Sequence, residues 1–298
     1  MLRNSFTLPS FAKINWFLRI LGKRDDGFHE LCTVFQTVSL HDDLTFCKSD
    51  EIVLTCSDKN IPTDDKNLIV KAANILSEKY CVKEGAKIHL EKRIPAPGGL
   101  GGGSSNAAVA LLGLAKLWQI ESNFEELLKI GKHLGSDVPF FFYGGTAFGT
   151  GRGTEIFPLN DFEENYILIV TPNIAVSTAE AFTRLNATHL TIKASKSILQ
   201  ICRNEAQALD LRQVELVNDF EKTVFEIEFE IGRVKGKLFD CGCVRALMSG
   251  SGASVFAVFD NKRKLEIALD ELKSEQGWRV FSVKTISRLE YQTFLKFT

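Results

Sequence analysis

The sequence predicts an α+β protein built from two domains. Its 298 residues are too many for one small domain and suit one large domain or two fused ones. Strand-like segments dominate residues 1–57, and segments with helical periodicity follow them. After Gly153 the pattern changes to one short apolar strand followed by polar helical segments. We therefore place the domain boundary near residue 160 and expect domains at 1–160 and 161–298.

The elements expected in each domain follow from local patterns. Runs rich in aromatic and aliphatic residues predict strands at 11–20, 31–40, 43–46, 51–56 and 87–91, with an Asp-Gly turn at 23–27. Apolar residues at helical spacing predict helices at 68–80, 105–118 and 124–134, with Asn67 as an N-cap and Gly135 at a C′ position. In the second domain we expect a strand at 166–170, a helix at 179–185, polar helical segments to about 229, a glycine loop within strands at 246–259 and a charged helix at 262–275.

Composition excludes several classes of protein. Hydrophobic residues make up 45% and charged residues 24%, which is typical of a globular protein and not of disorder, collagen or a coiled coil. The balance of 36 basic and 37 acidic residues argues against binding to nucleic acid by phosphate neutralisation. No apolar run approaches 18 residues, so we expect no membrane span. Seven cysteines without a C-x-x-C pair, and an N-terminus without an apolar signal core, favour a reduced cytoplasmic protein without structural zinc.

One loop carries the strongest local sign of function. It consists of Pro95, Ala96, Pro97, Gly98, Gly99, Leu100, Gly101, Gly102, Gly103, Ser104 and Ser105. Five glycines in six positions allow the backbone to approach a ligand closely, and the helix that follows offers free N–H groups and positive partial charge. We therefore expect a polyphosphate here, with Ser104 and Ser105 within reach of phosphate oxygens or Mg²⁺. The alternative is a flexible loop with a serine N-cap. The spacing fits neither the dinucleotide-binding nor the P-loop pattern.

Two polar residues interrupt the first strand. Because side chains alternate along a strand, Phe11, Lys13, Asn15 and Phe17 should share one face, and Ala12, Ile14, Trp16 and Leu18 the opposite core face. Lys13 and Asn15 are then candidates for a functional surface. The alternative is a lysine that protects an edge strand from aggregation.

Three separated segments resemble the signature of the GHMP small-molecule kinases: residues 12–15 (AKIN), 99–105 and 249–254 (SGSGAS). Residues 9–15, 22–31, 67–69 and 134–140 are similar, in the same order, to the members of that family that phosphorylate a cytidyl alcohol. The match runs from residue 9 to about 259. The resemblance implies a two-domain GHMP kinase fold, with a ribosomal-protein-S5-domain-2-like ATP domain and a ferredoxin-like α/β sandwich substrate domain.

The same resemblance implies ATP-dependent phosphorylation of the 2-hydroxyl of a cytidyl alcohol, a step of isoprenoid precursor synthesis. Asp137 then corresponds to the general base and Lys13 to the lysine that polarises the hydroxyl. Local pattern alone also allows Asp137 to be an N-cap. Asn67 and Lys92 fall where the family contacts adenine. Mg²⁺ is expected on the phosphates, with Ser105 as its protein ligand, and the chain is expected to be a monomer or weak homodimer.

The resemblance also assigns a substrate-binding set, namely Asn15, Phe28, His29, Thr178 and Phe182. His29 corresponds to a residue that hydrogen-bonds cytosine, although a lone histidine after a turn is usually a surface residue. Phe28 stands where the family usually has tyrosine, so stacking on a base is kept and the hydroxyl is lost. The alternative for Phe28 is packing in the core beneath the hairpin.

Two other functions remain open at this stage. A GHMP kinase for another alcohol, such as homoserine, would share the ATP loop but would not need the nucleobase contacts of residues 25–31. A non-catalytic nucleotide sensor would have no need to keep both Lys13 and Asp137.

Overall fold

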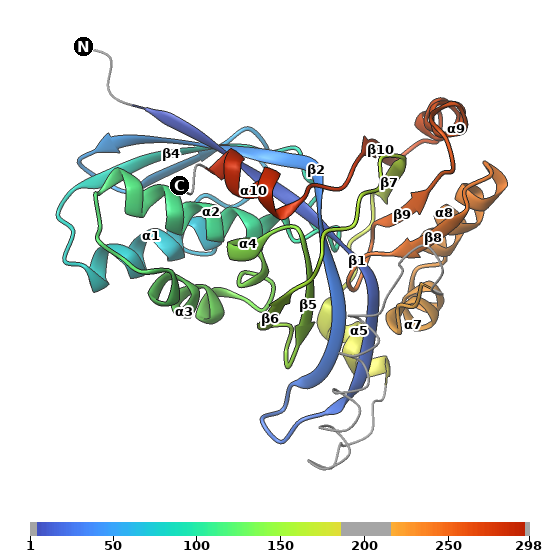
Figure 1. The fold of residues 1–298 in the computed structure, drawn as a ribbon, viewed down its shortest axis with the longest axis horizontal. Helices are drawn as coiled ribbons and strands as arrows, with labels where there is room; N and C mark the ends of the chain where they lie inside the picture. The colour runs from blue at the N-terminus through green and yellow to red at the C-terminus, as the bar shows by residue number, and fades with distance from the viewer. Residues whose placement is uncertain (1–4, 186–215, 296–298) are drawn as a thin grey trace.

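Two sheets, each covered by helices on one face, make up the protein (Figure 1). The computed structural model describes residues 5–185 and 216–295. The α+β class expected from the sequence is confirmed. Among the described residues, no helix is long and apolar enough to cross a bilayer.

The first sheet has the order β3-β4-β2-β5-β6, with β1 paired along β2. Its strands are β1 (Phe6–Lys23), β2 (His29–Ser49), β3 (Val53–Cys56), β4 (Gly85–Glu91), β5 (Thr146–Thr150) and β6 (Glu155–Pro158). Helices α1 (Leu68–Lys79), α2 (Gly102–Leu117) and α3 (Phe124–Leu134), with the short α4 (Phe140–Tyr143), cover one face. Their apolar side chains join those of β2 and β4 in one buried cluster, which explains why α2 is apolar nearly all round.

The β1–β2 hairpin is long, and its register shifts between Phe11 and Ala12, between Asn15 and Phe17, and between Ile20 and Gly22. Each shift changes which face a side chain meets. The expected core face holds for Ala12, Ile14 and Trp16, which share one apolar cluster. Phe17, expected on the opposite face, joins the same cluster, because the extra residue at Trp16 reverses the alternation. Leu18 is buried as expected, but it packs in the apolar cluster of the second sheet and also lines the cavity described below.

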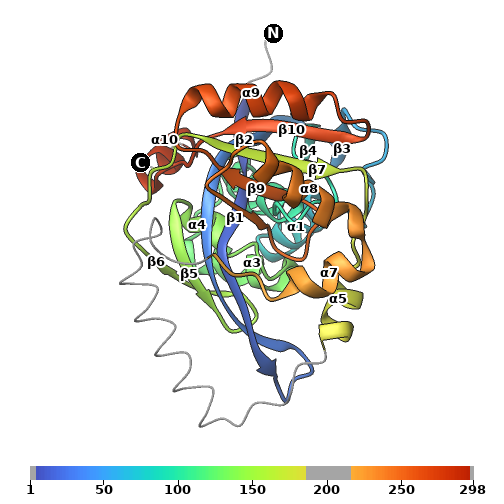
Figure 2. The ribbon, with the colours of Figure 1, turned by 90° about the vertical axis from the view of Figure 1, so that its right-hand side faces the viewer.

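The second sheet is antiparallel, with the order β10-β7-β9-β8. Its strands are β7 (Ile167–Pro172), β8 (Arg245–Met248), β9 (Val255–Val258) and β10 (Trp278–Val283). Helices α8 (Phe229–Asp240) and α9 (Lys262–Lys273) pack on one face, where Leu168 and Val170 point (Figure 2). Ile167 and Ile169 point to the other face, which rests on β1 of the first sheet. Trp16 meets Phe256 there edge to face, with 5.2 Å between ring centroids, so the two sheets share a buried apolar interface.

The end of the chain returns to the first sheet. After β10, the backbone bonds back to β2 through Ser39 and Thr37, and α10 (Arg288–Leu295) follows. Tyr291 is fully buried in the first apolar cluster and its hydroxyl donates to the carbonyl of Phe141. Helix α10 thus packs with the first of the two expected domains, although it lies at the end of the chain. The domain boundary near residue 160 stays a prediction.

Several expected elements differ in detail. Residues 31–40 and 43–46 belong to one continuous strand, and α2 begins three residues before Ser105. Gly135 ends α3 with φ 175°, which is extended backbone and not the left-handed C′ conformation. Asn67 does cap α1, since its side chain accepts from the N–H of Ile69. Helices α5 (Thr178–Leu185) and α7 (Phe220–Ile227) lie in the expected polar helical region, and residues 186–215 of that region lie outside the described residues.

Candidate active site

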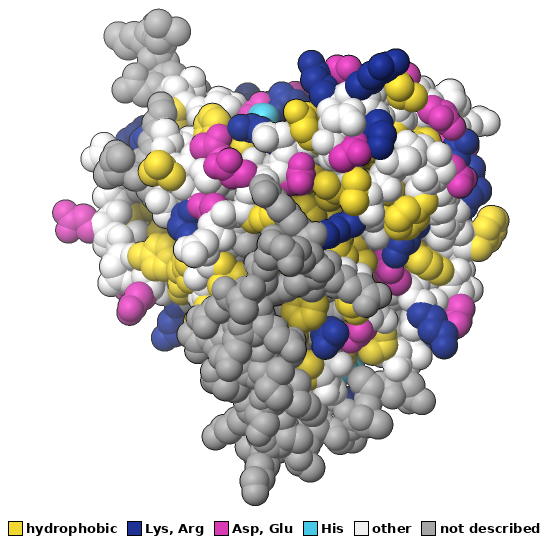
Figure 3. Space-filling view, turned by 45° about the vertical axis from the view of Figure 1, so that its right-hand side comes forward, with side chains coloured by type: hydrophobic (Ala, Val, Ile, Leu, Met, Phe, Trp, Pro, Cys, Tyr) yellow, Lys and Arg dark blue, Asp and Glu magenta, His cyan; other side chains and the backbone are white. Residues whose placement is uncertain are grey.

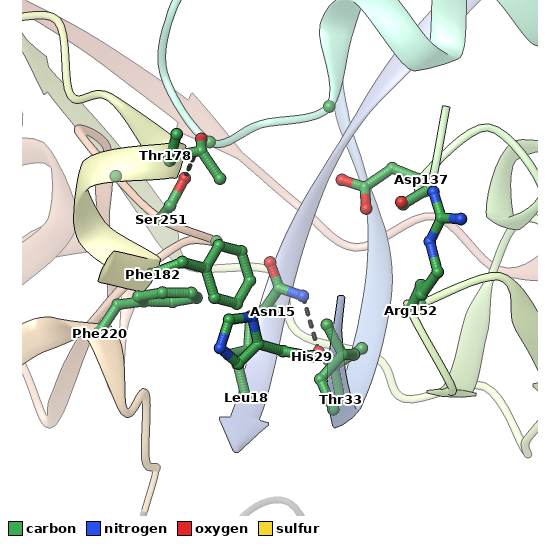
Figure 4. A pocket seen from close by; sticks show the side chains of 18 of the residues that line it. Asn15, Leu18, His29, Thr33, Asp137, Arg152, Thr178, Phe182, Phe220 and Ser251 are labelled. Atoms are coloured by element: carbon green, nitrogen blue, oxygen red, sulfur yellow. Dashed lines mark hydrogen bonds between the residues drawn. The ribbon is translucent and has the colours of Figure 1, made fainter. Parts of the chain in front are cut away.

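A cavity of about 850 Å³ opens where the β1–β2 hairpin meets the glycine loop, α5 and the loop between β8 and β9. Figure 4 shows Asp137 and Arg152 on one side, Asn15 and Thr33 in the middle, and a group from the second sheet's domain on the other side, namely Thr178, Phe182, Phe220 and Ser251. Both parts of the protein therefore supply its walls.

Lys13 and Asp137 meet inside this cavity. The Lys13 ammonium lies 3.5 Å from Oδ2 of Asp137. It also donates to Oδ1 of Asn15 at 2.6 Å, and Asn15 in turn donates to the hydroxyl of Thr33 at 2.7 Å. This chain of contacts holds the lysine against the aspartate.

The two partners differ in access to water, because the Lys13 side chain is 3% exposed and that of Asp137 is 34% exposed. Burial lowers the pKa of Lys13, and the negative charge of Asp137 opposes that shift. The burial of Lys13 rules out the edge-protecting lysine. Asp137 is not an N-cap either, since Pro139 holds that position before α4.

The glycine loop leads directly into α2, as a phosphate site requires. Gly101, with φ +70°, is the N-cap of α2, and no side chain caps it. The alternative of a serine N-cap is therefore wrong. A Cβ at Gly103 would meet no protein atom within 4 Å, whereas one at Gly102 would approach the side chains of Ile94 and Lys92. The first turn of α2 thus has open space at Gly103 and N–H groups without side-chain partners in the cap.

The second glycine loop, residues 249–254, packs on the first. The N–H of Ser254 donates to the carbonyl of Gly98, and the hydroxyl of Ser249 donates to the carbonyl of Gly99. A Cβ at Gly99 would stand 2.1 Å from the carbonyl oxygen of Ser249, so that glycine is required by the neighbouring loop. Asn218 donates to the carbonyls of Met248 and Gly250 and supports the second loop from behind.

Not every predicted loop residue faces the cavity. Pro97, Gly99 and Gly101 line it. The loop residues that do not line it are Pro95, Ala96, Gly98, Leu100, Gly102, Gly103, Ser104 and Ser105. Leu100 is buried, and its carbonyl accepts from the N–H of Lys13, which ties the loop to β1.

Asn67 and Lys92, the two expected adenine contacts, lie outside the cavity lining. The Asn67 side chain caps α1 and donates to the carbonyl of Pro62. The Lys92 ammonium pairs with Oδ2 of Asp42 at 2.8 Å and also donates to the carbonyl of Ile94. Both ion-pair side chains are almost fully buried. The Lys92 side chain thus holds the start of the glycine loop.

Ser105 does not fit a direct magnesium ligand. Its side chain is fully buried, and its hydroxyl accepts from the hydroxyl of Ser10 at 2.8 Å. Among the described residues, no group of three His, Cys, Asp or Glu side chains is arranged to hold a metal ion. The expectation that Ser105 binds Mg²⁺ directly is therefore wrong, because its hydroxyl points toward β1 and away from the cavity.

The expected base-binding residues do come together. The ring of His29 stacks on that of Phe182, with centroids 4.6 Å apart and planes 17° apart. Burial and the nearby charge of Lys23 lower the pKa of His29 and favour its neutral form. Thr178 shares a hydrogen bond of 2.8 Å with Ser251. The hairpin of the first sheet and α5 therefore meet through aromatic rings at one end of the cavity.

Phe28 is 47% exposed and lines the cavity, so its alternative placement in the core is wrong. One face of its ring is covered by the guanidinium of Arg152, whose central carbon lies 3.4 Å from the ring centroid. Sequence reasoning missed Arg152. The only signal was its position between Gly151 and Gly153, each of which has a positive φ.

The charges of the cavity differ from those of the outer surface. On the face that Figure 3 shows, Lys and Arg side chains are interspersed with Asp and Glu. In the cavity, the charged lining side chains of the described chain are Lys13, Lys23, Arg152 and Asp137. Three cations with one anion make this hollow suited to a ligand with several negative charges.

A phosphate-suited helix terminus, a lysine–aspartate pair and an aromatic base site in one cavity are the parts of a small-molecule kinase. The model of the GHMP kinases N terminal domain matches residues 67–145, and that of the GHMP kinases C terminal domain matches residues 197–277. The chain belongs to the GHMP kinase family. The expected two-domain fold and enzyme class are thereby confirmed.

Two relatives are similar over most of their length. The chain is 38% identical to the 4-diphosphocytidyl-2-C-methyl-D-erythritol kinase of Thermoanaerobacter pseudethanolicus, covering 94% of this chain and 96% of that protein. It is 41% identical to the enzyme of the same name from Protochlamydia amoebophila, covering 85% and 84%.

Solved structures agree with this family. The crystal structure of a 4-(cytidine 5'-diphospho)-2C-methyl-D-erythritol kinase matches with a TM-score of 0.75 and 30% identity, covering 94% of this chain and 99% of that one. A homoserine kinase from Cytophaga hutchinsonii matches with a TM-score of 0.67 and 18% identity, covering 97% and 96%. The second likeness shows the shared fold.

Proposed function

We propose that the protein transfers the γ-phosphoryl group of ATP to the 2-hydroxyl of 4-diphosphocytidyl-2-C-methyl-D-erythritol, giving the 2-phosphate and ADP. The observation that carries this proposal is the Lys13–Asp137 pair inside a cavity that has the glycine loop at one wall and the His29–Phe182 stack at another. The named relatives, which are similar over most of the chain, support the substrate. The reaction belongs to the non-mevalonate route of isoprenoid precursors.

Each residue has a role that its environment supports. Asp137, partly exposed, accepts the proton of the acceptor hydroxyl as the oxygen attacks phosphorus. The Lys13 ammonium favours the ionised carboxylate and attracts the developing alkoxide. The first-turn N–H groups of α2 hold phosphate oxygens. His29, Phe28, Phe182, Thr178 and Asn15 all line the cavity, and we assign them to the binding of the cytidyl substrate.

Mg²⁺, when bound, would neutralise charge on the ATP phosphates, and the buried Ser105 hydroxyl does not serve as its ligand. We further propose that residues 1–160, joined by α10, form the ATP-binding domain and that the rest of 161–298 forms the substrate domain.

Steady-state ADP release with three acceptors tests the function. We expect turnover with the cytidyl alcohol and background release with homoserine and with mevalonate. Phosphorus NMR of the product should place the new phosphate on the 2-hydroxyl. Equal turnover of homoserine would indicate another GHMP kinase. Tight ATP binding without turnover of any acceptor would indicate a nucleotide sensor.

A further inference from the structure

Arg152 occupies a fixed position in the cavity that the proposed chemistry has not used. It follows β5 and lies between two glycines in left-handed backbone conformations. The N–H of Gly151 donates to Oε1 of Glu30, and its carbonyl accepts from the N–H of Leu31. These bonds attach the Arg152 backbone to the start of β2, next to Phe28.

Among the described residues, the guanidinium of Arg152 forms no contact ion pair with a carboxylate. Asp26 is close enough to feel the charge of Arg152, but the contact ion pairs of Asp26 and Glu30 are both with Arg24, at 3.2 Å and 2.5 Å. The Nε of Arg152 is buried and has no hydrogen-bond partner in the described chain. Lys13, by contrast, has its charge balanced by Asp137. Arg152 therefore brings to the cavity a positive charge without a contact ion pair among the described residues and, at Nε, an N–H donor without a partner there.

We propose that Arg152 determines specificity by binding the diphosphate of the cytidyl substrate, an inference that rests on the proposed function. Stacking on Phe28 holds the guanidinium by its face and leaves its N–H edge free for oxygens in the same plane. That edge suits a bidentate contact with a phosphate, whereas an uncharged base gains little from it. Arg152 lies on the Asp137 side of the cavity, opposite Phe182 (Figure 4). In the substrate the diphosphate connects the base to the alcohol, so it must pass between these two sides.

The test compares two ligands that differ only in the diphosphate. Calorimetric titration with CDP and with cytidine should show that wild-type protein binds CDP more tightly. Arg152→Met keeps an aliphatic chain near Phe28 and removes the charge and the donors. We expect it to weaken CDP binding about 10- to 100-fold, as loss of a charge-assisted hydrogen-bond pair does, with cytidine affinity unchanged. The KM for the cytidyl substrate should rise similarly, while the KM for ATP and kcat stay within about twofold. Arg152→Lys should recover part of the loss.

Arg19→Met is the matched control. Arg19 also lies over a phenyl ring, that of Phe17, but it is exposed and does not line the cavity. Arg19→Met should therefore leave the affinities for CDP and for cytidine unchanged.

The outcomes separate the two proposals. If wild type prefers CDP and Arg152→Met does not alter that preference, the assignment of Arg152 is overturned and the function stands. Equal losses for CDP and cytidine would also overturn it, because Arg152 would then act through the base. A wild-type protein that binds neither ligand and does not turn over the cytidyl alcohol would overturn the proposed function itself.

Discussion

Lys13 and Asp137 face each other at 3.5 Å in the wall of the cavity, and the aspartate side chain is much more exposed than the lysine side chain, at 34% against 3%. The lysine comes from the middle of β1, between two shifts in strand register, and the aspartate from the loop between α3 and α4. Because the ammonium is shielded from water, its charge acts more strongly on nearby groups. The carboxylate, being partly exposed, stays within reach of a substrate hydroxyl.

Asp137→Asn should lower kcat by a factor on the order of 100 to 10,000, the usual worth of a positioned base, with little change in ATP affinity. Asp137 is partly exposed and caps no helix, and the Lys13 ammonium keeps its hydrogen bond to Asn15, so the fold should survive although the buried lysine loses its anion. Steady-state kinetics measures kcat, an ATP titration measures ATP affinity, and a thermal melt measures whether the fold survives. Activity within a few-fold of wild type would show that Asp137 is not the base.

The rate should fall at alkaline pH as Lys13 loses its proton. Burial lowers the pKa of Lys13 below 10.5, so this limb should begin at lower pH than for a free lysine. Asp137→Asn removes the opposing charge and should move the limb lower still. Between the lowered pKa and 10.5 the unfolded chain binds more protons, so this group makes folding more favourable as pH rises through that window. If the alkaline limb of the pH–rate profile lies at the same pH in Asp137→Asn as in wild type, the charge of Asp137 does not influence the pKa of Lys13.

Gly103→Val should abolish ATP binding without unfolding the protein. A Cβ at this position would meet no protein atom within 4 Å, so we attribute a loss of affinity in a folded variant to the space that phosphate needs. Gly236→Val on α8 is the matched control, since its Cβ also meets nothing within 4 Å. ATP titration by calorimetry and a melt compare the two. Unchanged affinity in a folded Gly103→Val variant would exclude the phosphate site.

Phe28→Ala should raise the KM for the cytidyl substrate about 5- to 150-fold, the range that corresponds to roughly 1–3 kcal/mol of base stacking, while the KM for ATP stays constant. Phe28→Tyr should be tolerated, and His29→Ala should act on the same substrate. Phe229→Ala, at a more exposed phenylalanine on α8, is the control for stability. A large drop in melting temperature for Phe28→Ala, with no selective effect on the cytidyl substrate, would exclude stacking.

Lys92→Met should lower the free energy of unfolding by about 3–5 kcal/mol, because it leaves the fully buried Asp42 carboxylate without its cation. Lys48→Met, in the exposed pair with Glu84, should change it by about 0–1 kcal/mol. Denaturant unfolding measures both. If Lys92→Met loses ATP affinity at full stability, the lysine binds the nucleotide as the resemblance implies.

Much of this protein was predictable because the relevant signals are local. The expected helices at 68–80 and 124–134 follow from apolar periodicity, and the Asn67 cap follows from the preference of asparagine for the N-cap position. The glycine loop was recognisable because clustered glycines before a helix signal a close backbone approach. Family membership was recognisable from several motifs in a constant order.

Other features depended on the tertiary structure, because contacts between distant segments decide them. Whether Lys13 is a surface or a buried residue follows from the packing of the glycine loop and Asp137 against β1. The bulge at Trp16 changes which cluster Phe17 and Leu18 join. Ser105 turns toward Ser10, and Lys92 toward Asp42, because buried polar groups must find partners wherever the fold supplies them. Arg152 had no motif of its own, and only the meeting of the β5–β6 turn with the β1–β2 hairpin places its charge on Phe28.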